Sequence, residues 1–393
     1  MIDFRMRPSP CKLVFSAILL TALYHPTDAQ DQPRQTRPRI EPRRDQHYTI
    51  PLIDLAGETH RQIIVEKTPG QYLGHTTTVL MPDGKTLFCT YPLGHGGPAA
   101  VLKQSRDGGL SWSERLRVPE NWSTATNCPS IHRVVDPHGV ERLIIMEGNG
   151  AMRQSVSVDH GQTWTPFQPN GLTCTVAPNT LVPLSGNRYL AHFAREDGDA
   201  QHIQIFQSVT EDGGVTWQPQ RLIVDVDGVA PDEPGTFLSP DGTRIVSLLR
   251  ENRRRANSLY IYSDNEGKTW SVPQELPAAL TGDRHMPRYA RDGRLVVTFR
   301  DMAGESPTHG DWVAWVGSYE DLFKGTEGQY RVRLMKNHHD FDCAYAGLEL
   351  LPDNTFVATT YGHWTKGEKP YIVSVRFTLE EIDQRTVMLT PNP

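Results

Sequence analysis

One eight-residue pattern occurs four times along this chain at nearly constant spacing. The copies are SRDGGLSW from Ser105, SVDHGQTW from Ser157, TEDGGVTW from Thr210 and SDNEGKTW from Ser263. Their tryptophans are 52, 53 and 53 residues apart. A fixed signature with a period of about 50 residues predicts a repeat protein in which each repeat is one small sheet.

The residue types of the octet predict a tight turn. Asp and Asn side chains accept hydrogen bonds from nearby backbone amides, and Gly supplies a positive φ. The Trp that follows can pack between neighbouring sheets. We therefore expect each octet to connect the third and fourth strands of its repeat. The octets then report the fold and not catalysis, and their Asp residues are not expected to bind metal.

The octet resembles the Asp box, Ser-x-Asp-x-Gly-x-Thr-Trp, of the sialidase-like β-propellers. This resemblance implies an all-β fold, a six-bladed β-propeller occupying residues 48–393. A decayed fifth copy begins at Ser318, and residues 342–382 supply a sixth blade. A strand at 48–53 or at 62–66 is expected to complete that blade, because ring closure protects the sheet edges. Each blade is expected to have four strands.

The N-terminus has the pattern of a secretory signal peptide at residues 1–29. It has a basic start, an apolar run at 13–24 and small residues before Gln30. A retained membrane anchor is the alternative, but no run of about 18 apolar residues is present. Residues 30–47 are basic and proline-rich and are predicted to be a disordered leader. The protein is therefore expected to be secreted or periplasmic.

Composition limits the kinds of ligand and partner that the chain is expected to bind. The net charge of −6 does not indicate a nucleic-acid ligand, and no cofactor, metal or stable membrane insertion is expected. Four cysteines follow the signal peptide: Cys89, Cys128, Cys174 and Cys343. An exported protein can form disulfides, but spacing does not give their connectivity. A Cys128–Cys174 pair and four free, buried thiols both remain open.

The hairpin that opens each predicted blade locates a ligand site. Its turns lie at 82–84, 136–139, 185–186, 240–242, 292–293 and 352–354. The start of the first strand and the end of the second meet at one rim of the channel. The strand starts bring His75, Ser130, Ala177, Glu233, Arg284 and Tyr345 to that rim, and the strand ends bring Tyr91, Glu147, Arg195, Arg250, Arg300 and Tyr361.

Arginines dominate this predicted rim. A guanidinium fork binds a carboxylate through two hydrogen bonds, so the cluster indicates an anionic ligand. The alternative is that each arginine pairs with an acid beside it in the sequence, such as Glu196, Glu251 or Asp301. Residues 253–255 are three further arginines, and we expect them to be solvated loop charge.

Two local patterns resemble the catalytic sialidases. Asp232-Glu233-Pro234 is followed after a turn by Ser-Leu-Leu-Arg250, and Ala344-Tyr345-Ala-Gly-Leu precedes Leu-Pro-Asp-Asn. The resemblance implies that Tyr345 is the nucleophile, Glu233 its base and Arg250 a carboxylate clamp. A neutral phenol approaches an anionic sugar without charge repulsion, and the carboxylate removes its proton. The alternative is that Tyr345 only plugs the channel.

The chain also departs from the sialidase pattern. Residues 71–76 lack the family's first Arg, 92–99 lack its acid Asp, and 310–315 lack its third Arg. His75 or His95 is expected to replace the acid, since imidazole transfers protons near neutral pH. The residues expected to bind substrate are Arg250, Arg300, Arg284, Arg288, Arg195, Glu147 and Tyr361.

These features favour a secreted exo-glycosidase that resembles exo-α-sialidases and hydrolyses a terminal anionic sugar, either sialic acid or another ulosonic or uronic acid. Its expected partner is an acidic glycan or glycoconjugate. One alternative is a carbohydrate-binding propeller without catalysis. Another is a hydrolase or lyase of a different acidic polysaccharide.

Overall fold

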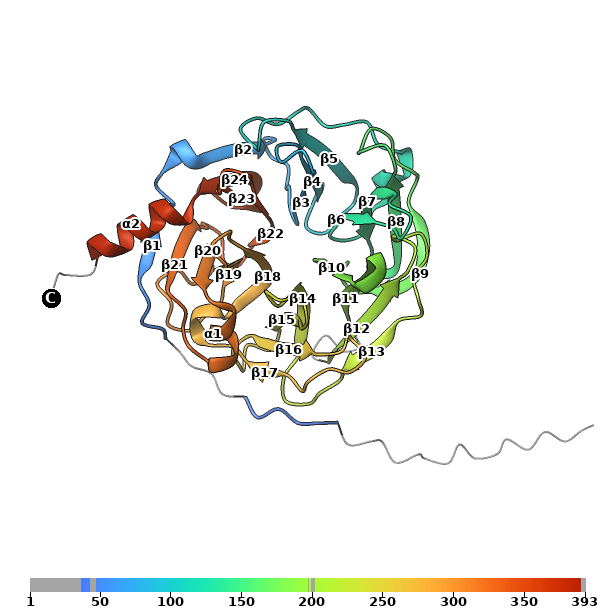
Figure 1. Cartoon of the computed structure of the whole chain (residues 1–393). Coiled ribbons are helices and arrows are strands. Elements are labelled where there is room, and N and C mark those ends of the chain that lie inside the picture. The colour runs from blue at the N-terminus through green and yellow to red at the C-terminus, as the bar shows by residue number, and fades with distance from the viewer. Residues whose placement is uncertain (1–36, 43–46, 197, 199–201, 390–393) are drawn as a thin grey trace, which may run out of the picture. The chain divides into compact units, whose positions relative to one another are not determined.

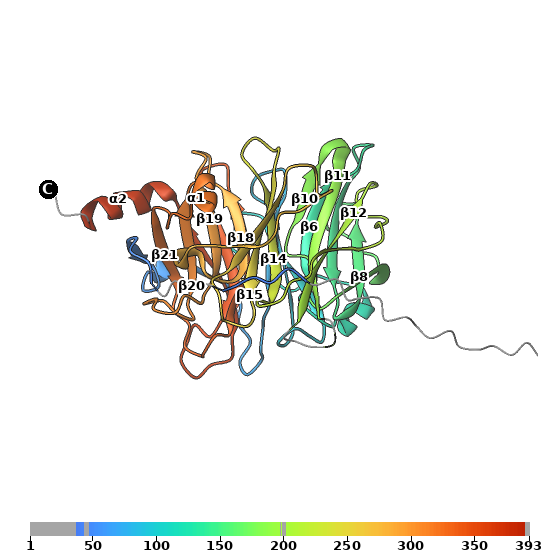
Figure 2. The same cartoon turned by 90° about the horizontal axis from the view of Figure 1, so that it is seen from below.

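A computed structural model describes residues 37–42, 47–196, 198 and 202–389. The predicted signal peptide and most of the predicted leader lie outside these residues. The described chain forms six sheets arranged around a central axis (Figure 1). The strands run between the two faces of the ring (Figure 2). The predicted six-bladed propeller is therefore confirmed.

The blades follow one another along the sequence. The first contains β3 (Thr77–Leu80), β4 (Leu87–Pro92) and β5 (Ala100–Ser105). The second contains β6 (Ser130–Val135), β7 (Glu141–Glu147), β8 (Gly150–Ser157) and β9 (Gln168–Cys174). The third contains β10 (Leu181–Leu184), β11 (Arg188–Glu196), β12 (Ile203–Thr210) and β13 (Arg221–Val224).

The remaining blades complete the ring. The fourth contains β14 (Pro231–Leu238), β15 (Ile245–Glu251), β16 (Leu259–Ser263) and β17 (Gln274–Glu275). The fifth contains β18 (Gly282–Tyr289), β19 (Leu295–Asp301), β20 (Trp312–Gly317), β21 (Tyr330–Met335) and β1 (Leu52–Asp54). The sixth contains β22 (Cys343–Leu350), β23 (Phe356–Gly362), β24 (Tyr371–Phe377) and β2 (Gln62–Glu66).

Strand number differs from the prediction in two blades. The first blade has three strands, because residues 113–116 run beside β5 with only two backbone hydrogen bonds, both of 2.8 Å. The fifth has five, because β1 adds in parallel to β21. Of the two segments proposed to close the ring, β2 does so by pairing antiparallel with β24.

The octets form the predicted turns after the third strands. In the second octet, Gly161 N donates to Ser157 Oγ (2.9 Å), and Thr163 N donates to Asp159 Oδ1 (2.9 Å). The octet glycine also packs on the preceding blade. A Cβ on Gly214 would lie 2.0 Å from Ile144 Cδ1 on β7. The octet glycine is thus required by inter-blade packing as well as by its positive φ of 82°.

The decayed fifth octet is not a turn of this kind. Ser318 caps the N-terminus of α1 (Tyr319–Lys324), and its side chain forms a capping box with Asp321. The physical reason is the spacing. The acid lies three residues after Ser318, as a capping box needs, and the position of the octet glycine is taken by Leu322, which is buried.

The C-terminal segment ends in a helix that the sequence pattern did not indicate. It is α2 (Leu379–Leu389), at the outer edge of the ring (Figure 1). Leu379 and Ile382 pack into the core cluster that also contains Phe356 and Phe377. Four short 3-10 helices lie in loops: η1 (Thr59–Arg61), η2 (Glu120–Thr124), η3 (Ser185–Asn187) and η4 (Ala278–Leu280).

Part of the predicted leader is packed. Ile40 N donates to Asp227 O (2.9 Å), and Ile40 contacts a core cluster shared by the third and fourth blades. The four cysteines considered above are buried and carry free thiols, so Cys128 and Cys174 do not form a disulfide. Within the described residues, no helix is both long and apolar enough to cross a lipid bilayer.

Candidate active site

Backbone distortion marks one rim of the channel. Five non-glycine residues at or just before the starts of inner strands have left-handed φ values: His75 (44°), Cys128 (36°), Glu233 (47°), Arg284 (54°) and Ala344 (71°). Strand register shifts at β14, β18 and β22, next to three of them. Such residues cost about 1–3 kcal/mol each and cluster at functional sites, and bulges re-aim side chains.

Tyr345 on β22 and Glu233 on β14 meet at this rim. The Tyr345 hydroxyl donates to Glu233 Oε1, and Arg250 Nη1 donates to the same oxygen (2.9 Å). Both Tyr345 and Glu233 are buried. Burial and the Glu233 charge raise the pKa of Tyr345 well above its ordinary value. Although burial opposes it, Arg250 lowers the pKa of Glu233. The pair is therefore a neutral phenol that donates a hydrogen bond to a carboxylate.

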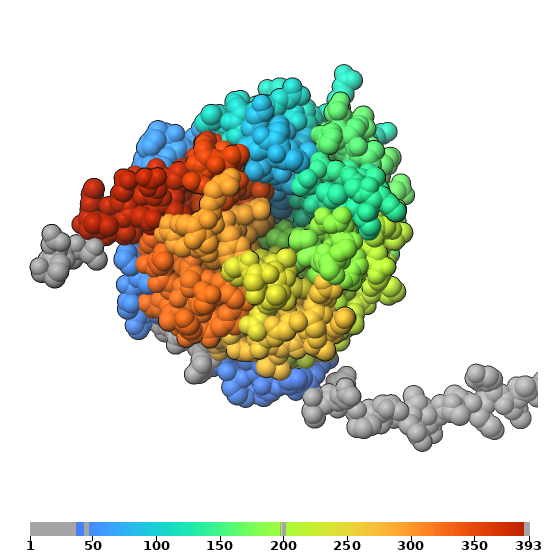
Figure 3. Space-filling view, viewed as in Figure 1, coloured from blue at the N-terminus to red at the C-terminus, as the bar shows by residue number. Residues whose placement is uncertain are grey.

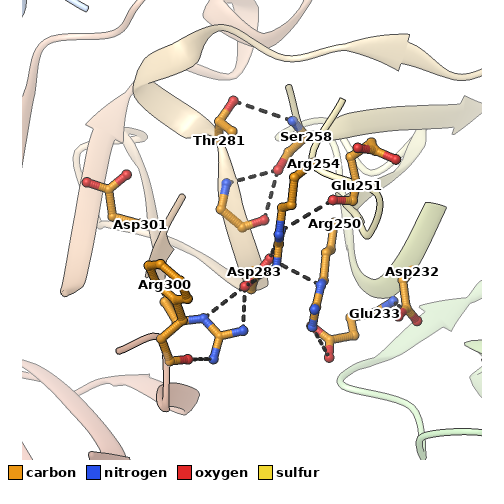
Figure 4. A network of polar contacts seen from close by, with 12 residues as sticks. Asp232, Glu233, Arg250, Glu251, Arg254, Ser258, Thr281, Asp283, Arg300 and Asp301 are labelled. Atoms are coloured by element: carbon orange, nitrogen blue, oxygen red, sulfur yellow. Dashed lines mark hydrogen bonds and ion pairs between the residues drawn. The ribbon is translucent and has the colours of Figure 1, made fainter. Parts of the chain in front are cut away.

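Asp283 on β18 is the centre of an arginine network that joins the fourth and fifth blades (Figure 4). Its Oδ2 accepts from Arg300 Nε and from Arg254 Nη2, each at 2.8 Å, and its Oδ1 lies 3.2 Å from Arg250 Nε. Asp283 is fully buried. Burial alone would raise the pKa of Asp283, but the arginines hold it far below its usual range.

The loop after β15 is fixed around this network (Figure 4). Glu251 Oε1 accepts from Ala230 N (2.9 Å), and its Oε2 accepts from Arg255 N (2.7 Å). Arg254 is therefore held against Asp283. The expectation that residues 253–255 are solvated loop charge is wrong for Arg254, because it meets a buried carboxylate from the next blade.

Asp232, directly before Glu233, has the opposite electrostatic character. Burial and the Glu233 charge raise the pKa of Asp232 to about 7. Its Oδ1 accepts from Glu233 N (2.8 Å), and its cross-strand partner is Arg250. Two adjacent carboxyl groups thus have pKa values displaced in opposite directions, which is how one group is kept as an acid and another as a base.

His75 and Arg284 both pack against Tyr345. The ring centres of His75 and Tyr345 are 4.2 Å apart, and the Arg284 guanidinium lies 5.0 Å from the Tyr345 ring centre. His75 Nδ1 is 3.0 Å from Cys128 Sγ. Burial, with His95 and Arg284 nearby, lowers the pKa of His75 well below its ordinary value. His75 is therefore a neutral ring packed on the phenol.

Several buried polar atoms of this cluster lack a hydrogen-bond partner among the described residues. They are Glu233 Oε2, His75 Nε2 and Arg284 Nε. Most buried polar atoms in proteins are hydrogen-bonded. Such a concentration around one tyrosine indicates a site built to meet another molecule.

A second group of polar residues lies beside the first. Asp342 Oδ1 accepts from the hydroxyls of Tyr72 (2.6 Å) and Tyr361 (3.1 Å). His95 Nδ1 is 2.7 Å from the Tyr72 hydroxyl, and the ring centres of His95 and His75 are 4.6 Å apart. The ring centre of Tyr361 is 6.2 Å from that of Tyr345, and His95 packs on His75, so this group adjoins Tyr345.

Four of the predicted substrate-binding residues make other contacts. Arg300 is turned to Asp283 and to the Phe341 carbonyl. Glu147 accepts from Thr126 N (2.7 Å) and pairs with Arg153 within its own blade. The guanidinium of Arg195 lies 4.3 Å from the Phe206 ring centre. Arg288 pairs with Glu349 (2.9 Å).

The structure does not bring Glu147, Arg195 or Arg288 to the Tyr345–Glu233 pair. Arg288 is four residues beyond Arg284 on an inner strand, about 13 Å further along it. There it lines a cavity of about 470 Å³ at the other end of the channel. Figure 3 shows a hollow at the centre of the ring. For Glu147 and Arg195, the hairpin spacing predicts a position at the rim but does not predict where the side chain points.

Three acids of the site, Asp232, Asp283 and Asp342, are not among the residues that the hairpin spacing selects. Each lies one to three residues before a selected residue: Glu233, Arg284 and Tyr345. For Asp232 and Asp283 the signal that would have identified them is an acid next to a selected position, because a bulge lets two consecutive residues face the same site. Asp342 lies in the loop before β22 and has no such signal.

Comparisons with known proteins identify the fold but no family. A scan against protein-family models finds no match, and neither does a search of curated proteins. Among solved structures, a Dyadobacter fermentans protein of unknown function has a TM-score of 0.66 at 14% identity, covering 80% of this chain and 97% of that one.

Two glycosidases are also similar. An α-L-arabinofuranosidase of Fusarium graminearum, in complex with an iminosugar inhibitor, has a TM-score of 0.61 at 12% identity and covers 82% of this chain and 99% of that one. The Hadza microbial sialidase Hz136 has a TM-score of 0.57 at 13% identity, covering 79% and 66%. At these identities the comparisons support the propeller fold alone.

Proposed function

We propose that this protein is a glycoside hydrolase that releases a terminal sugar, with Tyr345 as nucleophile and Glu233 as its base. The observation that carries the proposal is the buried contact between the Tyr345 hydroxyl and Glu233 Oε1, which Arg250 shares. The unpartnered polar atoms around this contact support a bound ligand. The glycosidases of similar fold support the reaction class.

The reaction proceeds in two balanced steps. Glu233 takes the phenolic proton as the Tyr345 oxygen bonds to the anomeric carbon, while the bond to the leaving oxygen breaks and that oxygen receives a proton. Water then attacks the anomeric carbon, losing a proton to the group that gave one in the first step. The Tyr345 oxygen leaves and regains its proton from Glu233.

We assign the proton donor of the first step to Asp232. Its pKa of about 7 lets it hold a proton at neutral pH and release it during the reaction. His75, one of the two histidines expected from the sequence, is less suited because its lowered pKa leaves it without a proton to spare. His95 stays a candidate, and the pH profile of an Asp232 variant separates the two.

The charge of the site favours an anionic sugar. Arg250, Arg254, Arg284 and Arg300 lie around Tyr345 and Asp283. When Asp232 is protonated, the ionised acids of the site are Glu233, Asp283 and the neighbouring Asp342. The cluster is then net positive, which suits a uronic or ulosonic acid such as sialic acid. Neutral arabinofuranosides, which the arabinofuranosidase class hydrolyses, should be tested beside the acidic sugars. We also propose export of the protein, from the signal-peptide pattern at residues 1–29.

The test is a panel of fluorogenic glycosides carrying sialic, other ulosonic, uronic and arabinofuranosyl groups. We expect release from one or more acidic members. Tyr345→Phe removes one hydroxyl from a packed ring, so ligand affinity by calorimetry should survive while turnover falls by about 100-fold or more. Tyr260→Phe is the matched control, because its hydroxyl bonds to Gln274 on the outer strands.

One outcome would replace the proposal with the carbohydrate-binding alternative. It is wild-type protein that binds an acidic glycan but releases no sugar between about pH 4 and pH 8, a range that spans the ordinary working pKa values of carboxyl and imidazole groups. Release that is equal in wild type and Tyr345→Phe would instead remove Tyr345 from the mechanism and leave hydrolysis standing.

A further inference from the structure

Two histidines and an aspartate converge on the same rim, beyond Tyr361. They are His339 and Asp342, in the loop between β21 and β22, and His363, just after β23. One potential ligand atom from each lies within 4.8 Å of the others. His363 Nε2 is 3.0 Å from Asp342 Oδ2, and the rings of His339 and His363 stack with centres 4.4 Å apart.

We propose that His339, Asp342 and His363 bind a divalent first-row transition metal ion, with Zn²⁺ the leading candidate. Two imidazole nitrogens and one carboxylate oxygen form a donor set that suits Zn²⁺ and its neighbours in the series. Three protein ligands leave at least one coordination position for water or a ligand oxygen. The exposure of His339 gives an ion access from solvent.

The ligand atoms are oriented before an ion arrives. His363 Nδ1 lies 3.0 Å from the Glu368 carbonyl, which accepts a hydrogen bond from it, so the ring is oriented with Nε2 toward Asp342 Oδ2. A metal bound between these two atoms takes the place of the proton on Nε2. Asp342 Oδ1 is held by the Tyr72 and Tyr361 hydroxyls, which leaves Oδ2 facing His363. Hydrogen bonds of this kind behind the ligands are typical of metal centres.

The two loops that carry the ligands are also tied together. Asn337 Nδ2 donates to the carbonyls of His339 (3.1 Å) and Asp340 (3.0 Å), and its Oδ1 accepts from His363 N (3.2 Å). His338 N donates to the His363 carbonyl (2.9 Å). The ligands thus come from a preformed arrangement, which lowers the entropy lost on binding.

The position of the triad gives the ion a role at the site. Tyr361 contacts Asp342, and its ring centre lies 6.2 Å from that of Tyr345. An ion there adds positive charge beside the arginines and offers a coordination position to a sugar hydroxyl or carboxylate. This role rests on the proposed function, whereas metal binding by the triad does not.

The test is titration of Zn²⁺ into chelator-treated full-length protein by calorimetry, with metal content after dialysis measured by mass spectrometry. We expect one ion per chain. His363→Ala and Asp342→Asn should weaken binding by at least about 100-fold, and Tyr72→Phe, behind the ligand, by about 10-fold. The matched control is His338→Ala, an exposed histidine in the same loop whose side chain is outside the triad.

A spectroscopic reading is independent of activity, and circular dichroism of the same samples shows whether each variant is folded. Co²⁺ in a site with nitrogen and oxygen ligands absorbs in the visible range, so the spectrum should appear with wild type and His338→Ala and be absent with His363→Ala. Equal Zn²⁺ affinity in wild type and His363→Ala, with circular dichroism showing both folded, would overturn the site. If Zn²⁺ binds but its removal leaves sugar release unchanged, the site stands and its role in substrate binding is refuted.

Discussion

Replacing Asp283 by Asn should destabilise the propeller more than any surface change, because this carboxylate is the shared partner of three arginines. Asp283 is fully buried and contacts Arg250, Arg254 and Arg300. Asn keeps the shape but removes the charge, and the guanidinium groups stay in place. Breaking a buried ion pair by removing one partner costs about 3–5 kcal/mol, so we expect a loss of that size in the free energy of unfolding.

The loss converts into a measurable melting shift. An unfolding entropy of roughly 2.1 cal/mol/K per residue amounts to about 0.7 kcal/mol/K for a propeller of this size, so the melting temperature should fall by about 4–7 °C. Asp54→Asn is the matched control. Asp54 is half exposed and pairs with Arg333 (2.6 Å), and exposed pairs contribute less than about 1 kcal/mol.

The pH dependence of this effect has a definite sign. The arginines depress the pKa of Asp283 in the folded state, whereas an unfolded Asp has a pKa of about 3.9. The stability that Asp283 contributes is therefore fully present above about pH 4 and is lost as pH falls below it. Urea unfolding at neutral and acidic pH measures both effects. A loss below about 1 kcal/mol at neutral pH, equal to that of Asp54→Asn, would refute the reasoning.

Two further predictions concern the acid and the octets. If Asp232 is the proton donor, turnover should fall as pH rises through about 7, where Asp232 loses its proton. Asp232→Asn should lower kcat by about 100-fold and remove this alkaline limb from the pH profile of kcat. An alkaline limb that is unchanged in Asp232→Asn would move the role to His95. Gly214→Ala should lower the free energy of unfolding by about 2–4 kcal/mol, because the added Cβ meets Ile144 and the φ of 82° is unfavourable for alanine. Gly186→Ala, also at positive φ but in open space, should lower it by about 1–2 kcal/mol. Equal losses in urea unfolding would contradict the packing argument.

The fold was predictable because it rests on local chemistry that repeats. Each octet makes its own turn and its own contact with the preceding blade, so four copies predict the ring. The structure differs from the prediction in two segments whose residues also suit another arrangement. Ser318 begins a helix and not a turn because Asp321 completes a capping box with it and Leu322 stands at the position of the octet glycine. The pairing of β1 with β21 was not predicted because parallel pairing of this kind has no sequence signature.

The site was predictable only in part, for a geometric reason. Spacing brought Tyr345, Glu233 and Arg250 to one rim, and the structure places them in contact. Spacing could not show that Arg288 lies at the other end of the channel, because side-chain position depends on strand register. It also could not show that Asp283 would neutralise Arg254, which is 29 residues away in the preceding blade, and Arg300, which is 17 residues away on the neighbouring strand.

The division between fold and function follows the division between what repeats and what does not. The octets are nearly identical in four blades, and each lies away from the rim that carries Tyr345. The residues at the rim follow no common pattern from blade to blade, and five non-glycine residues there have a left-handed backbone. Local rules fail at functional sites because the surrounding structure bears their cost. A chain that kept the octets but lost Glu233 and Asp283 would retain the reasons for a propeller and lose the reasons for this site.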